Sequence, residues 1–466
     1  MTVGDDSSWV SSMASTASGH ITLTAGNAMR LKGTVSSEAA GSITHMEAGD
    51  NSVWEADLTS NEGGQTQAQL GNGFSLTGSA QSTAEGSLTE LSAGKASQWN
   101  ATLLANNAGQ TRATLGNAFH FTGSAQASGA GSTVSLRSGD TSVWHVDFAA
   151  QDAGTTDATA GANSLWLGSS SVAAESTVNV TLGEASTWQV TTDSTLTNLN
   201  APNARLDLSK NALGNAQSVT VENTLTGGHG TLVMDLNDAN ADNKAAGNGS
   251  DYLTVKGAES TGAYSLVFSP ETSIVQLAPS QKLYFATVNG SGLTFGTQEN
   301  LAITTPDFLY SYQLAIGNES ENEWVHWFIA SQGSAKNSNT PIAQGVLSAI
   351  VRSAIDIDWM NQRQGDSRYS TDNSGLWVRA RYQKTSLDNT LSLKGTVVQA
   401  GYEHIKPMEN ANLQLGIGLD YADGEAKLTG YQGQNDLDRL GVILYGTYTH
   451  DSGWYQDTVL RLGKVS

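Results

Sequence analysis

The sequence predicts an all-β protein: a right-handed parallel β-helix with coils of about 22 residues, a β-rich cap, a linker helix and an incomplete antiparallel β-barrel. Three observations predict this fold class. Tryptophan recurs at a fixed step in the first half of the chain, apolar and polar residues alternate after each one, and longer alternating stretches fill the C-terminal part. The expected divisions are 1–204 for the β-helix, 205–335 for the cap, 336–370 for the linker and helix, and 371–466 for the partial barrel.

The composition excludes several classes of protein. The 466 residues carry a formal net charge of −21, which is the wrong sign for a nucleic-acid-binding protein. Hydrophobic residues make up only 38% of the chain, yet its 11 tryptophans argue against disorder. The absence of cysteine excludes disulfides and thiolate metal sites. The first residues, MTVGDDSSWV, lack the basic and apolar regions of a signal peptide, and no apolar run approaches the length of a membrane helix.

A 45-residue repeat organises the first half of the chain. The phrase Gly-x-x-Ser-x-Trp ends, at steps of 45, 45, 45 and 44 residues, at Trp9, Trp54, Trp99, Trp144 and Trp188. A second phrase, exemplified by LGNGFSLTG and LGNAFHFTG, keeps the same step through Gly26, Gly71, Gly116 and Gly161. The two phrases interleave at intervals of 22 and 23 residues, from Gly94 to Gly116 and on to Gly139. A fixed period over several units predicts a solenoid with two similar turns per repeat.

Alternation within the repeat indicates strands with one buried face. Trp99, Ala101 and Leu103 are apolar, whereas Asn100 and Thr102 between them are polar. The same pattern follows Trp54 and Trp144, and the second phrase supplies further apolar pairs: Met29 and Leu31, Phe74 and Leu76, Phe119 and Phe121. Period two is the geometry of a strand, so equivalent side chains are expected to stack from coil to coil in a narrow core. The alternative, a row of exposed tryptophans binding sugar rings, fits less well because each tryptophan begins an apolar face.

The segment 205–335 is predicted to form a cap of strands and hairpins that closes the open end of the solenoid. Its phrases NGSDYLTVKGAESTGAYSLVF, LYFATVNG and YSYQLAIG, with NEWVHWF, carry a specific resemblance. They resemble the pertactin-like autochaperone region of bacterial autotransporters, the proteins of type V secretion. The resemblance implies that this segment is the last part of a secreted passenger and that it nucleates folding of the β-helix outside the cell.

A helix is predicted over residues 341–364, after a polar linker. Pro341 suits the first helical position, and one face collects apolar residues at helical steps: Ile342, Val346, Ile350 and Ile357. Arg352, Asp356 and Asp358 exclude exposure to lipid. The following MNQRQGDSR is similar to the end of the linker helix that plugs autotransporter barrels. No Asn-Asn pair occurs in 341–364, so autocatalytic cleavage of the type that the family uses is not expected.

Residues 371–466 alternate in the manner of outer-membrane barrel strands. In LQLGIGLDY, the apolar residues Leu413, Leu415, Ile417, Leu419 and Tyr421 share one face, opposite Gln414, Gly416, Gly418 and Asp420. In VVQAGYEHI, Val398, Ala400 and Tyr402 lie opposite Gln399 and Glu403. About five such strands are expected, whereas the barrel of the family has twelve strands. We therefore expect a chain truncated at both ends. A soluble β-sandwich is the less favoured alternative for this segment.

No catalytic, cofactor-binding or metal-binding residue is predicted. The sequence Gly-Asp-Ser at 365–367 resembles a protease motif, but Arg368 follows it at the exit of the predicted helix. The histidines of the solenoid lack metal-ligand spacing: His20, His45, His120 and His145. Carboxylates of adjacent coils could still meet on one face of the β-helix without any linear motif.

Residues 235–251 fit the ligand pattern of a calcium-binding loop only in part. Counted from Asp238, Asn240 and Asp242 fit the ligand positions, but Asn243 stands where glycine is needed and Gly249 where the bidentate glutamate is needed. A solvated loop is the better interpretation.

Two functional hypotheses follow. The first is part of an autotransporter that is not an enzyme: the barrel lies in the bacterial outer membrane and the passenger at the cell surface, with adhesin or virulence functions. The resemblance implies three kinds of partner, namely outer-membrane lipid, the barrel-assembly machinery, and ligands on host or bacterial surfaces. No cofactor and no nucleic acid are expected. The second hypothesis is a polysaccharide-binding or polysaccharide-cleaving β-helix protein, which has no use for residues 341–466. The C-terminal segment therefore favours the first.

Overall fold

The computed structural model describes residues 1–209, 216–237, 241–247, 249–269, 272, 277, 280–296, 302–304, 310–336, 374–387, 391–428 and 434–465. They belong to two compact units, Met1–Ile303 with Tyr312–Gly333, and Thr304–Ser311 with Ser334–Ser466. Every regular element among the described residues is a strand. No helix in this described part is long and apolar enough to cross a membrane. The helix predicted for 341–364 lies outside the described residues.

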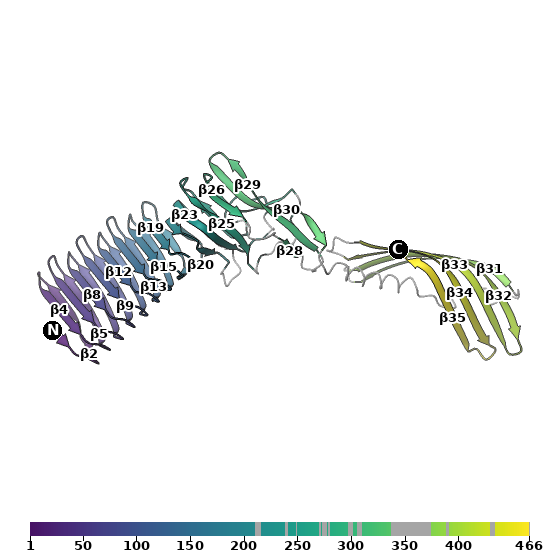
Figure 1. The fold of residues 1–466 in the computed structure, drawn as a ribbon, viewed down its shortest axis with the longest axis horizontal. Coiled ribbons are helices and arrows are strands. Elements are labelled where there is room, and N and C mark those ends of the chain that lie inside the picture. Colours follow the sequence, from purple (N-terminus) through teal and green to yellow (C-terminus); the bar gives the residue numbers. More distant parts are fainter. Residues whose placement is uncertain are drawn as a thin grey trace. The chain divides into compact units, whose positions relative to one another are not determined.

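Two columns of parallel strands build the solenoid, and Figure 1 shows its purple-to-teal strands lying one behind another. The column of nine-residue strands consists of β5 (Arg30–Glu38), β7 (Val53–Asn61), β9 (Ser75–Thr83), β11 (Gln98–Asn106), β13 (His120–Ser128) and β15 (Val143–Gln151). The column of six-residue strands consists of β4 (His20–Ala25), β6 (Ile43–Ala48), β8 (Gln65–Leu70), β10 (Leu88–Ala93), β12 (Gln110–Leu115), β14 (Thr133–Ser138), β16 (Thr155–Ala160) and β19 (Thr177–Leu182).

Shorter strands extend both columns. Before them lie β1 (Thr2–Val3), β2 (Ser8–Val10) and β3 (Met13–Thr16), and after them β17 (Leu165–Gly168), β18 (Ser170–Val172), β20 (Thr187–Val190), β21 (Ser194–Ala201) and β22 (Arg205–Asp207). The register confirms the predicted half-repeat, because Arg30 pairs with Val53, which in turn pairs with Ser75. The parallel β-helix predicted from the period is therefore confirmed.

The apolar face of each long strand fills the core, as the alternation predicts. Trp54, Trp99, Trp144 and Trp188 are all at most 2% exposed, so the sugar-binding alternative for these rings is wrong. The stacking is less direct than expected, because Trp99 has Leu76 and Phe121 as its register partners and not another tryptophan. Its ring meets Phe119 edge to face, with 5.2 Å between ring centroids, and Trp54 meets Phe74 in the same way.

The other residues of the repeated phrase hold neighbouring coils together. The backbone N–H of Asn72 donates to the Asp50 carboxylate of the preceding coil at 2.7 Å. Gly71 is required there, because a Cβ on it would lie 2.5 Å from the Asp50 amide nitrogen. The Ser97 hydroxyl accepts from the N–H of Phe74 at 3.1 Å and donates to the carbonyl of Gly94 at 2.9 Å. Glycine, serine and tryptophan of the phrase are thus all scaffold residues.

A column of buried hydroxyl groups runs along one corner of the same core. Its fully buried members are Ser37, Thr44, Ser60, Thr66, Ser82, Thr89 and Thr111. Each hydroxyl bonds to a neighbouring coil or to a nearby carbonyl: Thr89 Oγ1 donates to Ser60 Oγ at 2.9 Å, and Ser60 Oγ donates to the carbonyl of Leu88 at 2.8 Å. These bonds satisfy polar atoms that would otherwise destabilise a dry core.

The cap begins as a continuation of the solenoid. Beyond residue 204, β23 (Ser218–Met234), β24 (Tyr252–Val255), β25 (Thr261–Phe268), β26 (Lys282–Asn289) and β27 (Leu293–Gly296) still pair in parallel. The pairing direction changes at β26, which pairs antiparallel with β30 (Trp324–Lys336). The hairpin of β29 (Tyr310–Glu321) and β30 follows the short β28 (Ala302–Thr304). The hairpin expected in the cap is therefore present at the end of the solenoid.

The second unit contains a five-stranded antiparallel sheet. Its strands pair in sequence order: β31 (Ser374–Leu387), β32 (Leu391–Met408), β33 (Ala411–Leu428), β34 (Gln434–His450) and β35 (Tyr455–Val465). The number of strands and their antiparallel pairing agree with the prediction for 371–466.

Candidate functional site

One face of the β31–β35 sheet is covered by exposed apolar side chains. Leu415, Ile417, Leu419 and Tyr421 on β33 are each between 46% and 63% exposed, and Leu376 on β31 is 87% exposed. Their register partners continue the same face, since Ile417 pairs with Tyr402 and Leu444. Ordinary soluble proteins do not leave an apolar face of this extent in water. A groove of about 510 Å³ crosses this face beside Ala400.

The opposite face of the sheet is polar and holds buried charges. The Asp420 carboxylate, 1% exposed, accepts from Gln399 Nε2 and from Arg439 Nε, both at 2.6 Å. The Tyr445 hydroxyl donates to the Glu403 carboxylate at 2.7 Å. The predicted division of β32 and β33 into an apolar and a polar face is thus confirmed.

Glycines on the polar face make room for two aromatic rings. A Cβ on Gly401 would lie 2.7 Å from the Trp377 indole, and one on Gly418 would lie 3.1 Å from it. A Cβ on Gly416 would lie 2.1 Å from the Tyr445 ring. The period-two alternation of β33 therefore places glycine where an aromatic ring from a neighbouring or nearby strand crosses the sheet.

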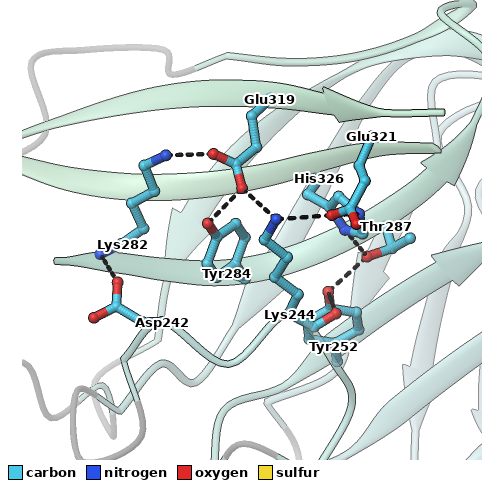
Figure 2. A network of polar contacts seen from close by, with 9 residues as sticks. All are labelled: Asp242, Lys244, Tyr252, Lys282, Tyr284, Thr287, Glu319, Glu321 and His326. Atoms are coloured by element: carbon cyan, nitrogen blue, oxygen red, sulfur yellow. Dashed lines mark hydrogen bonds and ion pairs between the residues drawn. The ribbon is translucent and has the colours of Figure 1, made fainter.

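A second polar cluster lies in the cap, where Figure 2 shows it between β26 and the β29–β30 hairpin. Glu319 is its centre: one carboxylate oxygen accepts from Lys244 Nζ at 2.7 Å and from the Tyr284 hydroxyl at 2.7 Å, and the other oxygen accepts from Lys282 Nζ. Lys244 Nζ also contacts Glu321 at 3.0 Å. We call Lys244, Lys282, Tyr284, Glu319 and Glu321 the cap cluster.

A chain of hydroxyl groups adjoins the cap cluster. The Tyr252 hydroxyl lies 2.7 Å from Thr287 Oγ1 and donates to the carbonyl of Lys244 at 2.8 Å. Thr287 Oγ1 in turn lies 2.9 Å from Nδ1 of His326, whose Nε2 is 3.9 Å from Glu321 (Figure 2). These contacts connect three strands, β24, β26 and β30, with the segment before β24.

The surroundings fix the charge of each group in the cap cluster. Hydrogen bonds from Lys244, Lys282 and Tyr284 lower the pKa of Glu319 to about 2, and the same carboxylate raises the pKa of Lys244 above its usual range. Burial and the bond to Glu319 raise the pKa of Tyr284. Burial and the Lys244 charge lower the pKa of His326, so its ring is neutral at pH 7. Opposite fixed charges suit a structural clamp better than a proton-transfer site.

Some residues that the sequence analysis considered as metal ligands lie among the described residues. His20, His120 and His145 are exposed and separate, while His45 contacts Glu47 at 3.4 Å. No group of three potential metal ligands occurs among the described residues. Asp242, part of the declined calcium loop, accepts from the backbone N–H of Lys282 at 2.8 Å. Asp238, Asn240 and the Gly-Asp-Ser at 365–367 lie outside the described residues.

The sheet supplies the match to a known family. Residues 374–466 match the family described as Autotransporter beta-domain, and the match begins at the first residue of β31. Residues 374–466 therefore belong to the β-domain of the autotransporters. The β31–β35 sheet is part of the β-domain that these proteins place in the bacterial outer membrane, and the solenoid is part of the passenger at the cell surface.

Other autotransporters are similar over parts of the chain. Serine protease EspC of Escherichia coli is 24% identical over 63% of this chain, and the pertactin autotransporter of Bordetella bronchiseptica is 30% identical over 23% of it. This chain spans 21% of EspC and 12% of that pertactin. The crystal structure of the Hap adhesin of Haemophilus influenzae has 16% identity and a TM-score of 0.45, with 67% of this chain and 33% of that chain covered.

Sequence reasoning missed the cap cluster and the hydroxyl column for different reasons. Lys244 and Glu319 are 75 residues apart and belong to no repeat, so nothing in the sequence pairs them. The hydroxyl column does follow the 45-residue step, from Ser15 to Ser60, from Ser37 to Ser82 and from Thr44 to Thr89. The period that revealed the tryptophans could also have revealed that column.

Proposed function

We propose that this autotransporter presents an adhesive passenger, and that its passenger binds ligands on host or bacterial surfaces through polar contacts. The supporting observation is the distribution of exposed large hydrophobic side chains in the described residues: outside 374–466, only Met1 and Val10 are of this kind. The solenoid surface is therefore hydrophilic, and a partner has to be recognised by hydrogen bonds and charge. Nucleic acid is a poor partner, because the net charge of −21 repels phosphate.

The β-domain is proposed to contact outer-membrane lipid through the apolar face that contains Leu415, Ile417 and Leu419. The barrel-assembly machinery of the outer membrane is proposed as the partner that inserts it. An inserted sheet needs its edges paired, because unsatisfied backbone groups are costly in hydrocarbon. The polar face, with Asp420 and Glu403 buried, then faces away from lipid.

No enzymatic activity is proposed for this chain, although its relative EspC is named a serine protease. The serines of the repeated phrase already bond to the backbone of adjacent coils, as Ser52 and Ser97 do. His450 contacts Ser452 at 2.7 Å, but the two are only two residues apart, at the end of β34 and in the exposed turn before β35. A serine probe for hydrolases, applied to the purified chain, is expected to leave it unlabelled, and labelling would refute this part.

Display and adhesion are tested on whole bacteria that produce the protein from its complete reading frame. An epitope inserted after Asn107, the exposed residue of the turn between β11 and β12, is expected to react with antibody on intact cells. Reaction only after lysis would refute display. The same bacteria are expected to adhere to host cells or to one another, and to lose adhesion when protease removes the epitope. Full display without any adhesion would refute the adhesive role alone.

A further inference from the structure

The segment Ala241–Gly247 crosses the cap cluster with almost no apolar anchorage. Asp242, Asn243, Ala245, Ala246 and Gly247 are exposed, and Ala241 has the one apolar side chain of the segment that packs partly against the core. We call residues 241–247 the strap. Because hydrophobic burial is the main source of local stability, a segment without it has little to keep it folded except polar contacts.

Polar contacts hold the strap at Asp242 and at Lys244. At Asp242, the backbone N–H donates to the carbonyl of Lys282 at 2.7 Å, and the carboxylate accepts from the Lys282 N–H at 2.8 Å. At Lys244, the ammonium group contacts Glu319 and Glu321, and the backbone carbonyl accepts from the Tyr252 hydroxyl. Figure 2 shows the Lys244 side chain reaching from the strap to both glutamates.

The surface beneath the strap is, in contrast, largely aromatic and well packed. Tyr252 and Tyr284 are 1% and 3% exposed, and Lys244 Nζ lies 5.8 Å from the centre of the Tyr284 ring. Tyr284 packs edge to face against His326 and Phe328 of β30. This floor is built by β24, β26 and β30, and its own contacts do not require the strap.

We propose that the strap is an electrostatic latch, which opens as a unit from the aromatic floor and is held closed chiefly by the Lys244 ammonium group. Opening leaves the hairpin paired to β26 and uncovers the Tyr252 hydroxyl, whose other partner is Thr287. The charges that face Lys244 are Glu319 and Glu321 of β29, with the Lys282 ammonium competing for Glu319. Salt therefore shifts the strap toward the open state, because half-exposed ion pairs are screened by dissolved ions.

Hydrogen exchange of the full chain in detergent, read by mass spectrometry, tests the latch. Lys244→Met removes the ammonium group and keeps most of the side-chain length. In this variant the strap amides are expected to exchange roughly 3- to 30-fold faster, the range that loss of two partly exposed ion pairs supports. Raising the salt from low to molar concentration should accelerate exchange of the strap amides in the parent chain. It should have little further effect on their exchange in Lys244→Met.

A matched control comes from another lysine–glutamate pair outside the cap cluster. Lys256 contacts Glu222 at 2.8 Å, with both side chains about as exposed as Lys244, and Lys256→Met should leave strap exchange unchanged. Glu321→Gln, at a 61% exposed position, is a milder second variant and should give a smaller acceleration. Unchanged strap exchange in both Lys244→Met and Glu321→Gln would overturn the proposal. Equal acceleration of the strap and of the β26–β30 amides would overturn it too, because the whole cap would then be loosening.

Discussion

The indole rings of Trp166 and Trp188 lie face to face, with 4.3 Å between ring centroids and 6° between ring planes. Their residues are register partners in β17 and β20, so no smaller side chain separates the two rings. Each indole N–H has a carbonyl partner, Val146 for Trp166 and Gly168 for Trp188. Earlier in the solenoid, by contrast, tryptophan alternates with leucine or phenylalanine along the same column.

Replacing Trp99 by alanine is expected to destabilise the solenoid by about 3–5 kcal/mol, the usual cost of removing a buried large aromatic side chain. The ring is 2% exposed and packs edge to face against Phe119, so its loss leaves a cavity between coils. Urea unfolding and resistance to protease measure the effect. The control is Gln98→Ala, an exposed neighbour on the same strand, which should change neither. A solenoid equally stable in both variants would contradict the buried-core interpretation.

The hydroxyl column is expected to show coupling between Ser82 and Thr111, whose hydroxyl groups are hydrogen-bonded to each other. Ser82→Ala alone should cost about 1–3 kcal/mol, because the N–H of Thr89 and the hydroxyl of Thr111 then lose an acceptor. Ser82→Ala with Thr111→Val should cost less than the sum of the two single changes, because no Thr111 hydroxyl is then left without its Ser82 acceptor. Strict additivity in a double-mutant cycle of urea unfolding would count against this expectation.

The cap cluster is expected to make the cap sensitive to strong acid. The pKa of Glu319 in the folded chain is about 2, below its ordinary value of 4.5, so its contribution is present above pH 4.5 and is lost as the pH falls toward 2. Unfolding of the cap followed between pH 5 and 2 should show this loss in the parent chain and not in Glu319→Gln. Glu222→Gln removes the carboxylate of the separate Lys256 pair and should keep the acid dependence. An identical pH profile for Glu319→Gln and the parent would rule out this role.

Gly416→Ala is expected to destabilise the sheet of the β-domain. The added methyl group would lie 2.1 Å from the Tyr445 ring, so the ring must move and its hydroxyl would leave Glu403. Gly446→Ala is the matched control in the same sheet, because its Cβ would meet only the end of the Leu415 side chain, at 3.3 Å. The midpoint temperature of thermal unfolding in detergent should fall clearly in Gly416→Ala and little in Gly446→Ala. Equal midpoints would show that the ring does not need the glycine.

The regular parts of this protein are predicted well from the sequence because the same residue pattern recurs in each repeat. The burial of Trp54, Trp99 and Trp144 follows from one pattern seen three times, and the two faces of β33 follow from strict alternation. The alternation of tryptophan with Leu76 and Phe121 was harder to foresee, since the half-repeat phrases differ in residue type.

The cap cluster could not be predicted, because it depends on tertiary contacts between single residues. Lys244, Lys282 and Glu319 come together only after β26 has paired with β30. The ligand positions of 235–251 argue against a calcium loop, but they do not reveal that the Asp242 carboxylate accepts from the backbone N–H of Lys282. Which partner such a loop residue finds is decided by the fold around it and not by its neighbours in sequence.

The constant register has a consequence for genetic change. Trp54 pairs with Leu31, and Trp99 pairs with the chemically identical Leu76. If recombination between repeats removed residues 54–98, Trp99 would follow Val53 and would again meet a leucine across the new junction. Coils away from the junction would keep the neighbours that they now have, because each contacts only the coils on either side, and the two coils at the junction would meet equivalent ones. Unequal crossing-over could thus shorten or lengthen the solenoid by whole repeats without creating a new type of contact between coils.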